Sequence, residues 1–318
     1  MVKSIDWEAA IGRRFRLRDL HVLFAVAQLG SMTQAARQLG VTQSAVSQIV
    51  TDLESALGVR LLDRSRRGVE LTIYGAILLR RGKAAFGELR QSIQEIESTA
   101  DPMAGEIRIG CPESISAAIL PPIVQAFSKK YSRVRLQFDT VTGANSAPGL
   151  RDRSLDLVFA RGGRALANLQ AADDMDVKTA LDDKLVVVAG AHSRWARRRK
   201  IDLAELAEEP WIFTPFGWGD EVLPSVFAAR GIDMPIASVK TFSIHLRINL
   251  VADGPFITAL PASVLKLYGE RLSLKALPVD LPVRPWSVAI VTLKNRTLSP
   301  VVERFIDTAC NRLGERRI

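Results

Sequence analysis

In the first third of the chain, apolar residues recur at the three- and four-residue spacing of helices that bury one face. The spacing predicts a helix over 17–29, a second over about 32–39 and a third over 43–57. Ser31 and Thr42 stand where the N-caps of the second and third helices would lie. The turn between these two helices is very short, which is typical of a helix-turn-helix.

The exposed side of the third helix carries short polar side chains that both donate and accept hydrogen bonds. They are Gln43, Ser44, Ser47, Gln48 and Thr51. Such side chains suit the edges of bases in a major groove, whereas an ordinary solvated helix face would carry Lys and Glu. The pattern therefore favours base readout over a solvated face.

After the third helix, two short apolar segments flank a basic loop. The segments are 59–62 and 69–72, and the stretch between them contains Arg64, Arg66 and Arg67. This arrangement predicts a two-stranded wing whose tip contacts phosphates or the minor groove. A basic hairpin alone is weak evidence, but here it directly follows a helix-turn-helix.

One long amphipathic helix is predicted over about 72–99. Its apolar positions are Ile77, Leu78, Phe86, Leu89, Ile93 and Ile96. The stripe is too narrow for a helix that is buried all round, so it predicts pairing with another helix. Packing against a domain of the same chain is the alternative. Asp101, Pro102 and Gly105 then break the helix and mark a domain boundary.

Beyond residue 105, short apolar segments alternate with helical ones, which predicts an α/β region with open sheets. The expected strands are 106–110, 134–140, 155–160, 185–189, 255–260 and 287–293, and the expected helices are 119–131, 202–206 and 300–313. In such sheets, ligands bind where the carboxyl ends of the strands meet loops and helix N-termini.

Candidate ligand contacts follow from where these strands end. Ser114, Thr142 and Arg161 each come just after an expected strand in the first half of the region. The second half adds Pro215 and Phe216, which follow the strand-like segment 211–213, and also Ser243 and Thr258. Helix capping is the alternative role for each hydroxyl, and a structural ion pair is the alternative for Arg161.

Composition agrees with a protein of about two domains, and its basic charge fits either a contact with a polyanion or a solvated face. The chain has 318 residues, of which 47% are apolar, and its 43 basic and 34 acidic side chains give a net charge of +9. Seven basic residues lie between positions 60 and 83. No apolar run approaches the roughly 18 residues that span a bilayer, and the N-terminus lacks the apolar segment of a signal peptide. A cytoplasmic protein is expected.

Residues that carry chemistry are scarce. The chain has two cysteines, Cys111 and Cys310, and three histidines, none at the spacing of metal ligands, so no metal or cofactor is expected. Cys111 follows a strand without basic neighbours, which favours a buried filler over a redox sensor. No nucleophile elbow, phosphate loop or dinucleotide fingerprint occurs, which weakens the alternative of an α/β enzyme. A solute-binding receptor is the other alternative, and the predicted DNA-reading domain argues against it.

Residues 15–72 closely resemble the winged helix-turn-helix of LysR-type transcriptional regulators. The matching residues are 30–36 (GSMTQAA), 39–47 (LGVTQSAVS), Leu53-Glu54, Leu57-Gly58, Leu61-Leu62, 64–68 (RSRRG), Leu71-Thr72 and Gly75. Met32 departs slightly, because Phe is common at that position. The α/β region resembles the effector domain of the same family through 107–110, 120–122, 155–157 and the segment from Gly254 to Pro261.

The resemblance implies three parts: an α+β winged helix-turn-helix, a long linker helix, and an α/β effector domain of two Rossmann-like lobes, similar to periplasmic binding proteins. The implied bounds are 15–72 for the first part, 73–100 for the second and 104–318 for the third. Lobe I is expected at about 104–163 and 268–318, and lobe II at about 164–267.

The implied function is that of a ligand-responsive regulator, not an enzyme, that binds operator DNA as a homodimer or homotetramer. In this family the linker helix forms the dimer contact. RNA polymerase is a further candidate partner. Expected DNA contacts are Met32, Thr33, Gln34, Thr42, Gln43, Ser44, Ser47, Gln48, Thr51, Arg64, Arg66 and Arg67. Expected effector contacts are Ser114, Thr142, Arg161, Pro215, Phe216, Ser243 and Thr258. Arg161 predicts a small organic anion, and the rings of Phe216 and Trp218 favour a planar carboxylate.

Overall fold

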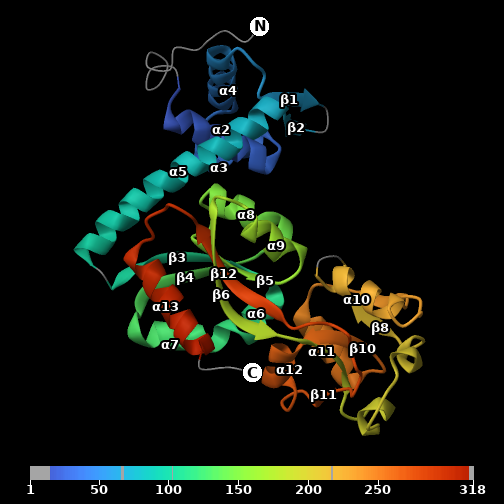
Figure 1. Cartoon of the computed structure of the whole chain (residues 1–318). Coiled ribbons are helices and arrows are strands. Elements are labelled where there is room, and N and C mark those ends of the chain that lie inside the picture. The colour runs from blue at the N-terminus through green and yellow to red at the C-terminus, as the bar shows by residue number, and fades with distance from the viewer. Residues whose placement is uncertain (1–14, 66–67, 102, 216–217, 315–318) are drawn as a thin grey trace. The chain divides into compact units, whose positions relative to one another are not determined.

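The computed structural model describes residues 15–65, 68–101, 103–215 and 218–314. The chain divides into two compact units, which comprise residues 1–89 and 90–318 (Figure 1). Each unit is described separately below.

The first unit contains the predicted helix-turn-helix. Its elements are α2 (Leu17–Leu29), α3 (Met32–Leu39), α4 (Gln43–Leu57), β1 (Leu62–Ser65), β2 (Gly68–Leu71) and the first part of α5 (Ile73–Ala100). Ser31 caps α3 by accepting a hydrogen bond from the Gln34 amide, and Thr42 caps α4 by accepting one from Ala45. Gly40 turns the chain between α3 and α4 with a φ of 66°, a left-handed conformation that glycine adopts at little cost.

The first wing strand begins later than the apolar pattern predicts. The backbone amides of Leu61 and Leu62 donate to Glu54 Oε1 in α4, at 2.7 and 3.1 Å, and both side chains are buried in the helical core. Segment 59–62 is therefore fixed by a carboxylate of α4, and strand pairing with β2 covers only Leu62–Ser65.

The N-terminal half of α5 packs on α2. The rings of Phe86 and Phe24 meet edge to face with their centroids 5.5 Å apart. Gly82 makes room for this contact, because a Cβ there would lie 2.8 Å from Cζ of Phe24. Further along the helix, Leu89, Ile93 and Ile96 are exposed. Packing within the chain thus accounts for Leu78 and Phe86 of the predicted apolar stripe, whereas Ile77 is exposed like the three residues further along.

Lobe I of the second unit is a five-stranded sheet in the order β4-β3-β5-β12-β6. The strands are β3 (Ala104–Cys111), β4 (Arg133–Thr140), β5 (Leu157–Arg161), β6 (Met175–Asp183) and β12 (Trp286–Leu293). β3 runs parallel to β4 and β5, whereas β12 runs antiparallel to β5 and β6. One face packs on α6 (Glu113–Ala118), α7 (Leu120–Lys130) and α13 (Pro300–Gly314), and the other on α8 (Gly143–Arg151) and α9 (Arg164–Gln170).

Lobe II repeats this three-layer plan with a sheet in the order β11-β7-β10-β8-β9. Its strands are β7 (Leu185–Gly190), β8 (Trp211–Phe213), β9 (Ala237–Lys240), β10 (Ile257–Pro261) and β11 (Leu274–Ala276). Its helices are α10 (Trp218–Ala228), α11 (Ile244–Asp253) and α12 (Ala262–Tyr268), with short 3₁₀ turns at Arg194–Arg197 and Leu203–Leu206. The predicted helix at 202–206 is thus one of these turns.

The sheet topology corrects the predicted lobe bounds. The chain enters lobe II between β6 and β7, near residue 184, and returns between β11 and β12, at 277–285. The expected bounds of 164–267 for lobe II are wrong because they ignore β6. That strand, MDVKTALDD, alternates charged and apolar residues at a sheet edge, so it lacks the apolar run used to recognise the other strands.

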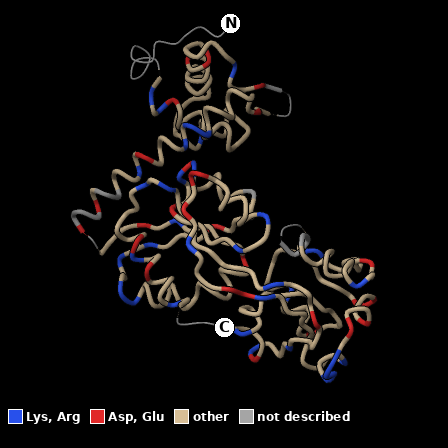
Figure 2. Tube along the Cα trace, in the orientation of Figure 1, with Lys and Arg blue, Asp and Glu red and all other residues tan. Residues whose placement is uncertain are grey.

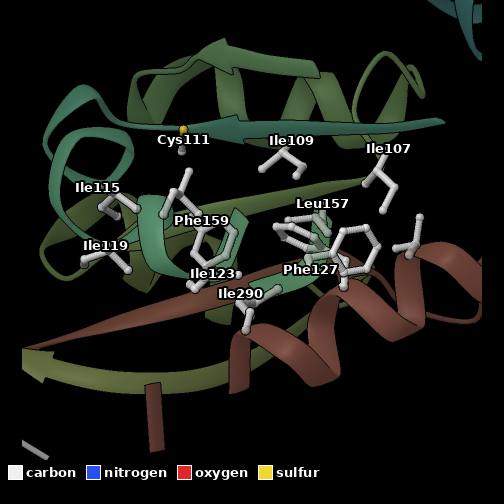
Figure 3. Close-up of a cluster of buried hydrophobic side chains, with 14 of the residues drawn as sticks. Ile107, Ile109, Cys111, Ile115, Ile119, Ile123, Phe127, Leu157, Phe159 and Ile290 are labelled. Carbon is white, nitrogen blue, oxygen red and sulfur yellow. The ribbon is translucent and has the colours of Figure 1, made fainter. Parts of the chain in front are cut away.

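The core of lobe I lies between the sheet and helices α7 and α13 (Figure 3). Phe127 of α7 is fully buried there, and its ring meets that of Phe305 of α13 edge to face at 5.1 Å. Ile107 and Ile109 of β3 are fully buried in the same cluster. This aromatic pair joins two helices that are distant in the sequence.

Replacing Phe127 with Ala should destabilise lobe I by roughly 3–5 kcal/mol, because it leaves a cavity between both helices and the sheet. Phe138→Ala is the matched control, since Phe138 lies on β4 with 38% of its surface exposed. Urea denaturation followed by circular dichroism measures both. Equal destabilisation by the two variants would contradict the assigned core.

Candidate functional site

The face of α4 opposite the core carries the predicted polar set. Gln43, Ser44, Gln48 and Thr51 are exposed and Ser47 is half-buried, whereas Val46, Val50 and Leu53 form the buried side. Gln48 Nε2 donates to Asp52 Oδ1 at 2.8 Å, and the Thr51 hydroxyl donates to the Ser47 carbonyl at 2.9 Å. Thr42 and Ser44 share a hydrogen bond of 2.9 Å between their hydroxyls. The face thus offers amides and hydroxyls in a fixed arrangement.

The predicted contacts at the start of α3 divide into two groups. Thr33 and Gln34 are exposed. Met32 is buried in the helical core with 7% of its surface exposed, so its side chain does not reach DNA. The prediction of Met32 as a DNA contact is wrong because this first residue of α3 lies on the buried side of the helix, with Ala35 and Ala36.

The basic contacts predicted from the sequence belong to the wing. Arg64 belongs to β1, and the predicted contacts Arg66 and Arg67 lie outside the described residues. Helix α4 itself contains no Lys or Arg, as the tube of Figure 2 shows. Positive charge for the phosphates must therefore come from neighbouring segments, among them the exposed Arg37 and Arg60.

A cavity of about 510 Å³ lies between the two lobes of the second unit. Its walls are the carboxyl ends of β3, β4 and β5 from lobe I, and the ends of β8 and β10 with the start of α11 from lobe II. This volume falls in the usual range of small-molecule sites. Glu113 crosses the cavity, because its Oε1 accepts a hydrogen bond of 2.9 Å from the Ile244 amide at the start of α11.

Three predicted contacts line this cavity: Ser114, Thr142 and Arg161. The Ser114 hydroxyl is buried and has no hydrogen-bond partner among the described residues. Thr142 precedes α8 without capping it through its side chain. Ser114 and Thr142 therefore have hydroxyls that helix capping does not occupy.

The predicted contacts from lobe II are corrected by the structure. Ser243 does not line the cavity, because its hydroxyl caps α11 by accepting from the Leu246 amide. Thr258 is fully buried beneath the wall and donates to the Ile212 carbonyl at 2.7 Å. Pro215 does not line the cavity, although its neighbour Thr214 does. Phe216 lies outside the described residues.

Arg247 of α11 is a lining residue that the sequence did not reveal. It is buried, with 7% of its surface exposed. Its Nη2 donates to Thr258 Oγ1 at 2.8 Å and to the Ala259 carbonyl at 2.6 Å. Sequence inspection places Arg247 among ordinary polar residues of an amphipathic helix, and only the packing of α11 on the lobe II sheet turns it inward.

The cavity is electropositive. Among the described residues that line it are three arginines, Arg161, Arg164 and Arg247, and one carboxylate, that of Glu113, which gives these lining residues a net charge of +2. Burial lowers the pKa of Arg161 to about 10, and Asp183 opposes the shift. Burial and, less strongly, the charge of Arg161 lower the pKa of Arg247 to about 10, against the effect of Glu113. Both guanidinium groups therefore stay charged at neutral pH.

Aromatic rings cover part of the apolar wall. Phe159 comes from lobe I, and Phe213 and Phe242 come from lobe II. These three rings supply the flat apolar surface that the sequence predicts from Phe216 and Trp218. The side chain of Trp218 is not described.

Cys111 and the basic run at 194–200 lie outside this chemistry. Cys111 is buried in the lobe I core, and burial raises the pKa of its thiol to about 12, so the reactive thiolate is scarce at neutral pH. In the basic run, Arg198 pairs with Glu205 at 2.9 Å and Arg194 pairs with Glu209. Figure 2 shows blue and red segments mixed in this part of lobe II.

The described residues contain no group of three or more His, Cys, Asp or Glu placed to hold a metal ion. None of their helices combines the length and apolarity needed to cross a membrane.

Comparison with known proteins identifies both domains of the chain. Residues 17–76 match the model "Bacterial regulatory helix-turn-helix protein, lysR family", and residues 100–313 match "LysR substrate binding domain". The transcriptional regulator TdcA of Escherichia coli is 27% identical over 92% of each chain. The crystal structure of CbnR, a LysR family transcriptional regulator, matches with a TM-score of 0.70 at 20% identity, over 94% of this chain and 99% of that one. Full-length CbnR complexed with its target DNA matches with a TM-score of 0.69 at 21% identity, over 94% and 100%.

A winged helix-turn-helix joined to a two-lobed domain with an effector pocket defines a DNA-binding transcriptional regulator, and not an enzyme. Because the substrate-domain model alone covers more than half of its residues, the chain belongs to the LysR family of transcriptional regulators.

Proposed function

We propose that this regulator responds to a small organic anion, a planar carboxylate, bound in the cavity between the two lobes. The observation that carries the proposal is the net charge of +2 on the lining, with Arg161 at the end of β5. A guanidinium binds a carboxylate through two parallel hydrogen bonds. The Ser114 hydroxyl supplies a further donor, and Phe159, Phe213 and Phe242 supply apolar walls for a flat ligand.

On the DNA side, we propose that α4 enters the major groove and reads bases, while the wing contacts the sugar-phosphate backbone. Support comes from the exposed amides and hydroxyls of Gln43, Ser44 and Gln48 and from the absence of Lys and Arg in α4. Thr33 and Gln34, exposed at the start of α3, are proposed to contact the same groove edge.

We also propose that the active form is a homodimer joined through α5, or a homotetramer built from two such dimers. One winged helix covers only a short half-site, so two related half-sites require a two-fold partner. Leu89, Ile93 and Ile96 are 45%, 57% and 70% exposed, which is an apolar stripe suited to pairing with a second copy of the helix. RNA polymerase as a partner stays a prediction of the family resemblance.

For DNA, Gln43→Ala and Ser44→Ala should reduce discrimination between a selected duplex and a random one by roughly 1–3 kcal/mol each. Arg64→Ala and Arg66→Ala should instead weaken binding to all duplexes and lower the slope of affinity against salt by about one phosphate contact each. Fluorescence anisotropy at several salt concentrations, with a duplex selected by the wild type, measures both. Gln28→Ala, exposed on α2, is the control, and equal effects at Gln28 and Gln43 would contradict the assignment.

For assembly, Ile93→Asp should separate the paired helices, because it places a charge in an apolar contact. We expect a smaller particle in light scattering at micromolar concentration and loss of cooperative DNA binding. Ser92→Asp adds the same charge on the adjacent, exposed position and serves as the control. A wild-type monomer with intact affinity for the selected duplex would contradict the proposal.

For the effector, calorimetry with benzoate and related monocarboxylates should detect binding to the wild type. Arg161→Gln should weaken that binding about tenfold or more, because a charge-assisted hydrogen-bond pair is lost. Benzylammonium, of similar shape but opposite charge, should not bind. Preference for the cation, or equal carboxylate binding without the Arg161 guanidinium, would show that this pocket assignment is wrong.

A further inference from the structure

A carboxylate from lobe I occupies part of the lobe II wall of the cavity. Glu113 follows β3 and is the first residue of α6, whereas the amide that it binds, that of Ile244, begins α11 of lobe II. Oε1 of Glu113 accepts this hydrogen bond at 2.9 Å. Because Glu113 also lines the cavity, an acidic side chain of the protein itself takes up part of the proposed anion site.

The start of α11 offers hydrogen-bond donors that suit a small anion. The first four amides of a helix have no partner within the helix, and the helix dipole favours negative charge at this end. The Ser243 hydroxyl accepts from the Leu246 amide, and Glu113 accepts from the Ile244 amide. In the same turn, Arg247 is buried and lines the cavity, and its Nε has no hydrogen-bond partner among the described residues. The Ile244 amide and the Arg247 guanidinium therefore lie together at this helix end.

Glu113 is held at this helix end by a bond that another carboxylate can replace. Its carboxylate forms no ion pair with a described residue. Burial and the charge of Arg161 lower the pKa of Arg247, and the charge of Glu113 opposes them. Exchanging one carboxylate for another at the Ile244 amide costs little, because the hydrogen bond lost and the one gained are of the same kind.

The Glu113 contact joins the two lobes, and other contacts of α6 do the same without charge. Ala118 is buried in the lobe II cluster that contains Ile244. The Tyr268 hydroxyl of α12 donates to the Ala117 carbonyl at 3.4 Å. Release of Glu113 therefore leaves α6 attached to lobe II, and variants of Glu113 test its carboxylate without separating the lobes.

Resting on the proposed anion site, we propose that Glu113 is a built-in competitor of the effector, whose carboxylate occupies the Ile244 amide until an anionic ligand displaces it. The ligand carboxylate gains the hydrogen bond that Glu113 gives up. Displacement also breaks a direct bond between lobe I and α11 of lobe II, so effector binding is coupled to the contact between the lobes. Glu113 thereby lowers the affinity of the site and raises the effector concentration to which the regulator responds.

Calorimetry with benzoate on the full-length wild type and two variants of Glu113 tests the competition. Glu113→Ala leaves the Ile244 amide free and should tighten benzoate binding about tenfold or more, because the ligand gains a charge-assisted hydrogen bond without breaking one. Glu113→Asp keeps the charge but withdraws the carboxylate by about 1.5 Å, the length of one C–C bond. It should also tighten binding, although by less, because a negative charge stays near the ligand.

Hydrogen exchange, measured by mass spectrometry on the full-length protein, follows the Glu113 contact without any ligand. Both variants should speed exchange of the Ile244 amide, whereas the Leu246 amide, which Ser243 caps, should keep its rate. The same two substitutions at Glu303, which is exposed in the first turn of α13 and outside the cavity lining, change the net charge equally. They should alter neither measurement. Thermal melting of each variant shows that it is folded.

The outcomes separate this inference from the proposed function. The inference is overturned if Glu113→Ala leaves exchange of the Ile244 amide unchanged, or if it binds benzoate no tighter than the wild type does. Tighter binding by Glu113→Ala but not by Glu113→Asp shows charge repulsion alone, and equal effects at Glu303 show an effect of net charge; either result also overturns it. In these cases benzoate still binds, so the anion site stands. If benzoate and related carboxylates bind neither the wild type nor the Glu113 variants, both proposals are overturned.

Discussion

The ligand-facing groups of the second unit depend on where two strands end, β3 of lobe I and β8 of lobe II. In lobe I, β3 lies between β4 and β5, and in lobe II, β8 lies between β9 and β10. The chain passes from β3 to β4 on one side and then across to β5 on the other, and from β8 to β9 and then to β10 in the same way, so a crevice opens at the carboxyl ends of β3 and β8. Residues 112–114 and Thr214 follow these two ends and line the same cavity. The walls of the site are thus a consequence of strand order, and loop sequence determines only its chemistry.

That chemistry is fixed by packing around buried charge. Thr258 lies beneath the wall, where it donates to a carbonyl of β8 and accepts from Arg247 of α11. One hydroxyl on β10 thus connects three elements of lobe II and orients the guanidinium before any ligand arrives. Glu113 acts between the lobes, since this lobe I carboxylate binds the amide at the start of α11. Negative charge is favourable at that helix end.

The sequence predicts the helix-turn-helix well because its signals are local: apolar spacing, capping hydroxyls and glycines that end each helix. The same rules locate Ser114 and Arg161, because strands β3 and β5 are apolar and end where that pattern ends. They fail for Arg247, since an inward-facing arginine and a solvated one look alike in an amphipathic helix. They fail for β6 as well, because its alternating charges resemble a loop. Ser243 and Thr258 show that a hydroxyl near a strand end has a role that only its hydrogen-bond partner reveals.

Lobe I also holds the C-terminal part of the linker helix α5. Gln91 is buried; its Nε2 donates to the Thr297 carbonyl at 2.7 Å, and its Oε1 accepts from Arg296 at 2.8 Å and from Arg153 at 3.1 Å. Next to it, Arg90 lies 3.6 Å from the buried Asp156, whose other oxygen accepts from the Arg108 amide of β3. If α5 slid along lobe I, these contacts would break and leave buried charges without partners, which costs free energy. The C-terminal end of α5 is therefore held on lobe I by buried polar contacts of Arg90 and Gln91.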